Sequence, residues 1–195
     1  MKQIAIFASG AGSNAARIID HFRHSPSIKI SLVVSNKPGA GVLAIAEKEQ
    51  IASIILEKEQ FLRGNAYVDE LKEKHIDFIV LAGFLWKVPS ALIKAYKDSI
   101  INIHPALLPK YGGKGMYGRL VHEAVVLAKE TETGITIHYV DELYDHGQII
   151  FQATCPVDAT DTPETVAHKV HQLEYQHFPE IIESVVLSKK IVKTT

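Results

Sequence analysis

The feature that most constrains the fold is the alternation of short apolar runs with helical patterns over the first hundred residues. The apolar runs lie at residues 4–8, 30–34, 53–56, 78–81 and 100–103, and the helical patterns lie at 15–23, 42–50, 66–74 and 89–96. Apolar runs of this kind are typical of strands that are covered on both faces of a parallel sheet. The alternation therefore predicts a Rossmann-like, doubly wound α/β fold with right-handed crossovers.

The pattern changes after residue 103. Residues 104–119, HPALLPKYGGKGMYGR, predict a long loop before a helix over residues 120–129. Two further strands, 134–140 and 148–157, are separated by one short turn and are expected to pair as an antiparallel hairpin. Asp161 or Thr162 then caps a long C-terminal helix that carries Pro163 in its first turn.

Composition excludes several classes of partner. The 195 residues suit one α/β domain, and a net charge of -1 gives no indication of binding to nucleic acid or to a membrane surface. The single cysteine, Cys155, excludes an internal disulfide and a metal site built from several cysteines. A signal peptide and an apolar run near the ~20 residues that span a bilayer are both missing, which predicts a cytoplasmic location.

The first apolar run ends in a glycine-rich turn, SGAGSN, in which Gly10, Gly12 and Ala15 fit the pattern G-x-G-x-x-A. Such a turn directs backbone N–H groups and a helix N-terminus at one point, where an anion can bind. Ser13 and Asn14 either add side-chain donors or cap the following helix.

A dinucleotide site would also need an acidic residue at the end of the second strand, to hold the ribose hydroxyls. The residues at that place are Ser35-Asn36-Lys37, of which Lys37 leaves NADP open. The turn therefore favours a monophosphate over a dinucleotide, and an NADP-dependent oxidoreductase stays an alternative.

Asn102 and His104 lie two residues apart at the end of the fifth strand, so their side chains share a face at the edge where α/β proteins bind ligands. An amide donor beside an imidazole suits acyl transfer, although loop backbone could equally satisfy both groups. Asp141, Glu142 and Asp145 lie in a turn further along the chain. One of them could contact His104, raise its pKa and fix its tautomer, or all three could be solvated.

Taken together, SGAGSN, VVSNKP, VLAGFLWKVP, INIHPALLPKY, GITIHYVDELYDHGQII and HQLEYQHFPEII resemble the family of phosphoribosylglycinamide formyltransferases in order and approximate spacing. The resemblance covers nearly the whole chain. It implies a formyltransferase fold and transfer of a formyl group from 10-formyltetrahydrofolate to glycinamide ribonucleotide, in purine biosynthesis. It also implies that no metal or nicotinamide cofactor takes part, that neither nucleic acid nor a membrane is a partner, and that the protein is a monomer or homodimer.

The resemblance further implies roles for individual residues. Asn102, His104 and Asp145 are the implied catalytic residues, and Asp145 is expected to keep His104 protonated. Asn102 and the protonated His104 are then expected to donate hydrogen bonds to the formyl oxygen. The implied phosphate and ribose site consists of Gly10, Ala11, Gly12, Ser13, Asn14, His171 and Glu174. The implied folate site consists of Arg63, Phe84, Leu85, Trp86, Lys87, Val88, Asn102, Val140, Asp141, Glu142 and Asp145. A bulky residue at Gly12 is expected to weaken binding of the ribonucleotide alone.

The resemblance divides the single domain into a phosphate-binding half (1–100), a catalytic and folate-binding half (101–188) and a loose tail (189–195). Three features depart from the family pattern. Loop 110–119 is several residues longer, and is expected to cover the site, with His122 matching a family histidine. Arg63 stands in for an arginine at the folate tail, and His171 replaces a residue that is often Lys or Gln.

Relatives with the same catalytic residues carry extra domains, as in methionyl-tRNA formyltransferase and formyltetrahydrofolate hydrolase. The chain begins at its first strand and ends with its long helix, so neither extra domain is expected. A non-catalytic folate-binding module is a further alternative, disfavoured because all three catalytic residue types are present.

Overall fold

Residues 1–63 and 65–188, which the computed structural model describes, form a seven-stranded sheet of order β3-β2-β1-β4-β5-β6-β7. Its strands are β1 (Lys2–Phe7), β2 (Ile28–Ser35), β3 (Ala52–Ile55), β4 (Phe78–Leu81), β5 (Ile100–His104), β6 (Glu132–Tyr139) and β7 (Ile149–Pro156). The pairs from β3 to β5 are parallel, whereas β6 and β7 are antiparallel. The predicted Rossmann-like sheet with a C-terminal hairpin is confirmed.

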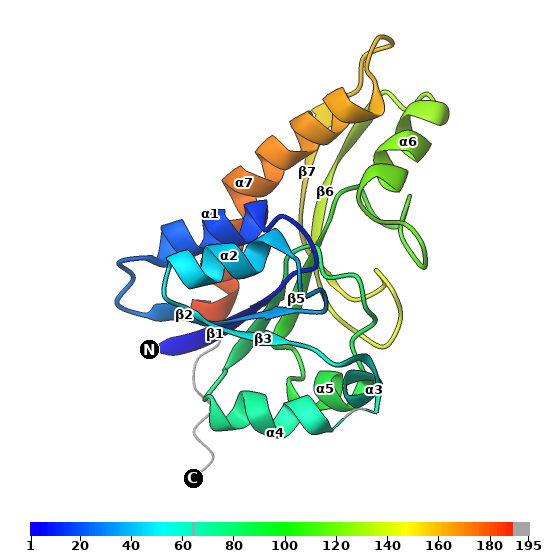
Figure 1. Ribbon diagram of the computed structural model, residues 1–195. Helices are drawn as coiled ribbons and strands as arrows, with labels where there is room; N and C mark the ends of the chain where they lie inside the picture. The colour runs from blue at the N-terminus through cyan, green and yellow to red at the C-terminus, as the bar shows by residue number, and fades with distance from the viewer. Residues whose placement is uncertain (64, 189–195) are drawn as a thin grey trace.

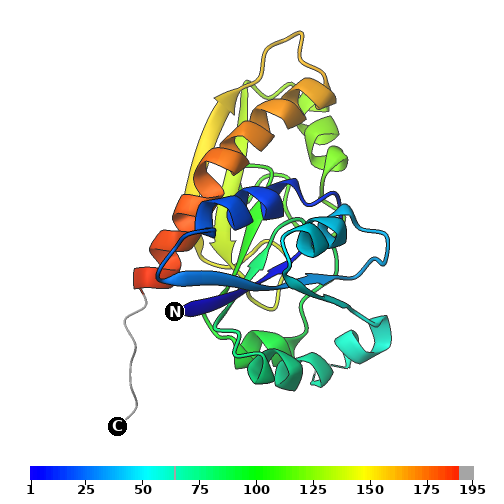
Figure 2. The same ribbon diagram turned by 60° about the vertical axis from the view of Figure 1, so that its left-hand side comes forward.

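Helices cover both faces of the sheet (Figure 1). They are α1 (Ser13–Phe22), α2 (Gly41–Lys48), α3 (Lys58–Leu62), α4 (Ala66–Glu73), α5 (Ser90–Ala95), α6 (Arg119–Leu127) and α7 (Pro163–Ser188). The helices α1, α2 and α7 pack on one face, and α3, α4 and α5 on the other. The long helix α7 runs beside the β6–β7 hairpin and also contacts α1 and α6 (Figure 2).

Successive residues of β1 show why the apolar runs do not alternate. Ile4 and Ile6 belong to the core under α1, α2 and α7, whereas Ala5 and Phe7 belong to the core over α3, α4 and α5. All four side chains are fully buried. A central strand with both faces covered needs apolar residues at every position, and this is the pattern from which the fold was predicted.

The structure differs from the prediction at several helix ends. The short helix α3 was not expected, and α5 begins at Ser90, one residue after the expected start at Pro89. Of the two alternatives for Ser13 and Asn14, capping of α1 is not adopted, because Gly12 is the N-cap of that helix. Thr162, one of the two expected caps, accepts a hydrogen bond from the Thr165 N–H at 3.3 Å.

The expected boundary between the two halves, at residues 100 and 101, lies inside β5, so the halves share one sheet. The predicted tail, 189–195, lies outside the described residues. None of the described helices is both long and apolar enough to cross a membrane.

Candidate active site

The turn after β1 lies at the carboxyl edge of the sheet, beside the end of β4. In the strand order, β2 and β3 extend from one side of β1 and β4 from the other, which makes this edge a topological switch point. A cavity of about 640 Å³ opens here and is lined by residues 9–14, 82–85, 102–105 and 113–118, together with Lys37, His122, Tyr144, Asp145, His171 and Glu174. Both glycines of the turn and both strand-end polar residues therefore face one space.

Gly12 is required by the fold itself. Its φ is +81°, and a Cβ there would lie 2.8 Å from the Cα of Val42 on α2. A Cβ at Gly10 would meet nothing within 4 Å. A bulky residue at Gly12 would therefore disturb the packing against α2 in addition to any effect on the ribonucleotide, and Gly10 is the position that tests the turn as a binding site.

Ser9 connects three strand ends beneath this turn. Its hydroxyl donates to Asn36 Oδ1 at 2.5 Å and accepts from the Leu85 N–H at 2.9 Å. Asn36 stands where a dinucleotide-binding protein would carry its ribose-binding acid, and its side chain is buried in this contact. The Asn36 side chain is therefore occupied by Ser9, and the preference for a monophosphate over a dinucleotide stays a prediction.

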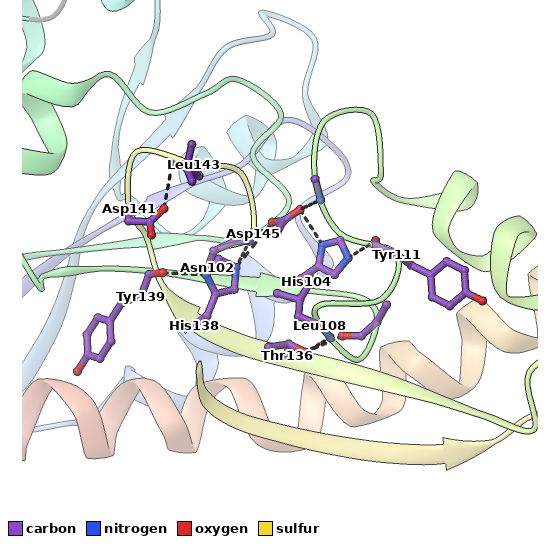
Figure 3. Close-up of polar contacts among 12 residues, drawn as sticks. Asn102, His104, Leu108, Tyr111, Thr136, His138, Tyr139, Asp141, Leu143 and Asp145 are labelled. Atoms are coloured by element: carbon purple, nitrogen blue, oxygen red, sulfur yellow. Dashed lines mark hydrogen bonds and ion pairs between the residues drawn. The ribbon is translucent and has the colours of Figure 1, made fainter. Parts of the chain in front are cut away.

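His104 lies between a backbone carbonyl and a carboxylate (Figure 3). Its Nε2 is 2.8 Å from the Tyr111 carbonyl oxygen, and its Nδ1 is 3.5 Å from Asp145 Oδ2. Since the carbonyl can only accept, Nε2 carries a proton, and in the neutral ring Nδ1 is then unprotonated. Nδ1 is therefore the atom that can take up a proton, next to a carboxylate that stabilises the resulting charge.

Burial lowers the pKa of His104, and this effect is larger than the opposite effects of Asp145 and the Tyr111 carbonyl. Asp145 raises this pKa, as expected for a neighbouring acid. The expectation that it keeps His104 protonated is wrong, because the residue is only 3% exposed and the charged form loses its hydration. His104 is consequently neutral near pH 7 and suited to act as a base.

Asp145 is held in an unusual backbone conformation, with φ at +52°. Its Oδ2 accepts a hydrogen bond from the Gly113 N–H at 2.9 Å, which joins the long loop to the turn between β6 and β7. Burial raises the pKa of Asp145, but His138, His104 and the Gly113 N–H together lower it more, so the net shift is downward. Asp145 is therefore a carboxylate at neutral pH.

Comparison with known proteins agrees with this geometry. The model of the family described as formyl transferase matches residues 2–182. The chain belongs to the formyl transferase family. It is 40% identical over 194 residues to the chloroplastic phosphoribosylglycinamide formyltransferase of Vigna unguiculata, covering 94% of this chain but 61% of that protein.

A bacterial relative matches over nearly its whole length. The phosphoribosylglycinamide formyltransferase of Bacillus subtilis is 35% identical over 191 residues, with 95% of each chain covered. The crystal structure of the phosphoribosylglycinamide formyltransferase from Bacillus halodurans superposes with a TM-score of 0.87 at 35% identity, covering 100% of both chains. These likenesses extend over both predicted halves of the formyl transferase chain.

Most residues predicted to bind folate line one of two cavities, and two of them line neither. Trp86, Lys87, Val88, Val140 and Asp141 line a smaller cavity of about 70 Å³, which shares Phe84, Asn102, Tyr144 and Asp145 with the main one. Leu85 lines the main cavity. Among the described side chains, Glu142 and Arg63 lie outside the lining of both cavities, and Arg63 pairs with Glu59 at 3.0 Å.

Part of the long loop lines one side of the main cavity. Residues 113–118 line the main cavity, and they include Lys114, Met116 and Tyr117. His122, at the start of α6, also lines it, and burial lowers its pKa to about 4. Its Nδ1 has no hydrogen-bond partner among the described residues, which leaves a polar atom for a ligand.

Three groups at the site were not predicted from the sequence. His138 lies 3.0 Å from Asn102, the Tyr111 carbonyl holds His104, and the Gly113 N–H holds Asp145. His138 carries a weak signal, because it is a histidine only three residues before the acidic turn that begins at Asp141. The two backbone groups carry none, since any residue type supplies them. Within residues 1–63 and 65–188, no cluster of three or more His, Cys, Asp or Glu side chains could hold a metal ion.

Glu174 of α7 reaches back to the glycine turn. It accepts a hydrogen bond from Asn14 Nδ2 at 2.9 Å and is only 5% exposed. Burial raises its pKa from 4.5 to about 7. His171, one helical turn earlier, is half-buried, and burial lowers its pKa. Both line the main cavity opposite residues 10–14.

The raised pKa of Glu174 predicts a pH-dependent stability. Its contribution to folding is complete below pH 4.5, where the carboxyl is neutral in both states, and is lost as the pH rises through about 7. Relative to Glu174→Gln, the wild type should lose about 3 kcal/mol of unfolding free energy between pH 4.5 and pH 8. Urea unfolding of both proteins measures this difference, and parallel pH dependences would contradict the assignment.

Proposed function

We propose that the chain transfers the formyl group of 10-formyltetrahydrofolate to the amine of glycinamide ribonucleotide, a step of purine biosynthesis. The observation that carries the proposal is the convergence of Asn102, His104 and Asp145 on a cavity that also reaches the glycine-rich turn. Relatives named phosphoribosylglycinamide formyltransferase support it. The chain spans less than two thirds of the Vigna unguiculata relative, so the comparison with that protein concerns this region alone.

In the proposed reaction the amine nitrogen attacks the formyl carbon and forms a C–N bond. Negative charge develops on the formyl oxygen, where an N–H of Asn102 donates a hydrogen bond. His104 Nδ1 takes the proton that the amine releases, and Asp145 stabilises the imidazolium that results. The bond from carbon to N10 of the folate then breaks, and the same proton passes to N10. Atoms and charges balance without a metal or a redox cofactor.

The ribonucleotide is proposed to bind along the glycine turn. Backbone N–H groups of residues 10–14 and the N-terminus of α1 supply the donors that a phosphate needs, and Glu174 can accept from the ribose hydroxyls. The pterin is proposed to lie toward Phe84 and the smaller cavity. Anchoring the phosphate away from the reacting atoms contributes positioning rather than reactivity.

The decisive experiment measures the absorbance change of a 10-formylfolate analogue with and without glycinamide ribonucleotide. Formyl transfer requires both compounds, so the change should appear only when both are present. Loss of the formyl group without the ribonucleotide would identify a hydrolase instead. No change with both compounds would contradict the proposal, and a fluorescence change with NADPH would then favour the oxidoreductase alternative.

Gly10 and Gly12 provide a matched pair of variants for the phosphate site. Gly10→Val adds a side chain where the backbone has room, so it should raise the KM for the ribonucleotide roughly 10-fold by blocking donors to the phosphate. The KM for the folate should stay unchanged. Gly12→Ala strains a positive φ and contacts Val42, so it should lower the unfolding free energy by about 1–3 kcal/mol. Equal effects of Gly10→Val on both KM values would contradict the assignment.

Several expectations stay predictions: a cytoplasmic location, a monomer or homodimer, and the absence of nucleic acid or membrane partners. The Vigna unguiculata relative is named chloroplastic. The folate role of Arg63 also stays a prediction, and its ion pair with Glu59 would have to open for it.

A further inference from the structure

Asn102 and His138 face each other directly across two strands. They are opposite residues in the antiparallel pairing of β5 with β6, so their side chains lie on the same face of the sheet. Asn102 Nδ2 lies 3.0 Å from His138 Nε2 (Figure 3). The imidazole is 2% exposed, and water therefore does not compete for this contact.

The second nitrogen of His138 determines which partner donates. Nδ1 lies 2.8 Å from the carbonyl oxygen of Tyr139, which can only accept, so Nδ1 carries the proton of the neutral ring. Nε2 is then an acceptor. A side-chain amide must turn its NH₂ group, and not its oxygen, toward such an acceptor. The orientation of the Asn102 amide thus follows from hydrogen-bond chemistry alone.

We propose that His138 is a positioning residue that holds the Asn102 amide with its NH₂ group in place for the formyl oxygen. This inference rests on the proposed function. One N–H is donated to His138 Nε2, and the second stays available for the developing negative charge. An amide flipped about the Cβ–Cγ bond would place Oδ1 next to the formyl oxygen instead, and Oδ1 would repel the developing negative charge.

Asp145 defines the competing arrangement. Its Oδ1 lies 3.7 Å from His138 Nε2, which is beyond hydrogen-bond range. A doubly protonated His138 would donate from Nε2 toward Asp145, and the Asn102 amide would then have to present its oxygen to the ring. The two arrangements differ in whether Nε2 is protonated, and this difference can be measured directly.

The first experiment is ¹⁵N NMR of the imidazole rings in the protein without substrate at pH 7. The His138 signals are assigned by their loss in His138→Phe. We expect a protonated Nδ1 and an unprotonated Nε2. A protonated Nε2 would overturn the proposal. This measurement needs no turnover, so it stands where the proposed function fails.

The second experiment is a double-mutant cycle on formyl transfer. His138→Phe should lower kcat by up to roughly 10²-fold with little change in either KM, because the amide loses its fixed orientation. On an Asn102→Ala background the same substitution should alter kcat within about twofold, since nothing is left to orient. His138→Gln places an acceptor oxygen near Nε2 and should recover part of the loss. Independent, multiplicative effects of the two substitutions would overturn the proposal.

The two failures are distinguishable. A wild-type protein that transfers no formyl group contradicts the proposed function, and the NMR result still decides how His138 holds Asn102. A wild type that transfers the group while His138→Phe retains full kcat contradicts the positioning role alone.

Discussion

Replacing His104 by alanine is expected to lower kcat roughly 10²–10⁴-fold, the range that general acid–base catalysis usually contributes. The side chain supplies the only atom, Nδ1, to which we assign the amine proton, and it lies 3.5 Å from the carboxylate that stabilises the charge. The KM for the ribonucleotide should change little, because the glycine turn binds it elsewhere. Steady-state kinetics with the 10-formylfolate analogue measures both constants.

His146→Ala is the matched control for this variant. His146 lies next to Asp145 in the same turn but is exposed and pairs with Asp141 at 2.7 Å. It lies outside the lining of both cavities among the described residues. Its replacement should leave kcat unchanged. Near-normal turnover of His104→Ala would overturn the assignment of His104 as the base.

The downward shift in the pKa of His104 also sets the sign of the pH dependence. A base must be unprotonated, so kcat/KM should rise with pH through a pKa below 6.5 and be level at neutral pH. An enzyme that needed the protonated imidazolium would lose activity as the pH rises over the same range. A kcat/KM that falls between pH 5 and 7 would therefore indicate that His104 acts as a protonated hydrogen-bond donor and not as a base.

Continuous apolar runs allowed the sheet to be predicted, because strands buried on both faces, such as β1, leave a strong local pattern. The helix α3 was missed because a short helix leaves no such local pattern. It has five residues, of which Phe61 is the buried one, so no periodicity can develop. Local sequence left two roles open for Asn14, helix cap or side-chain donor, because its acceptor, Glu174, lies 160 residues away.

In the site, too, local spacing revealed some residues, whereas contacts between distant residues were not visible in the sequence. Asn102 and His104 were found because their spacing in one strand fixes a shared face, and the resemblance added Asp145. His138 was missed as the partner of Asn102 because their contact depends on the β5–β6 register. The pKa of His104 was misjudged because a neighbouring acid is visible in the sequence, whereas the degree of burial emerges only when the long loop packs over the ring.

Replacing Asp145 by asparagine is expected to lower kcat by a factor similar to that for His104→Ala, roughly 10²–10⁴. This substitution removes the charge of Asp145 without changing the backbone conformation that the turn requires. Asp145 has φ at +52°, a conformation that asparagine adopts more readily than most residues, so the turn should fold unchanged. The amide oxygen can still accept the Gly113 N–H. Alanine at this position would add backbone strain, so that the loss of charge and the loss of turn stability could not be separated.

The pH profile of Asp145→Asn tests whether the carboxylate acts through His104. Asp145 raises the pKa of His104 against the larger effect of burial, so its neutralisation should lower that pKa further. The acidic limb of kcat/KM should therefore move to lower pH while kcat falls. His104 would be unprotonated over a wider range yet slower, because its protonated form lacks a counter-charge when the amine proton arrives. A reduced kcat with an unshifted limb would mean that Asp145 acts on the substrate directly.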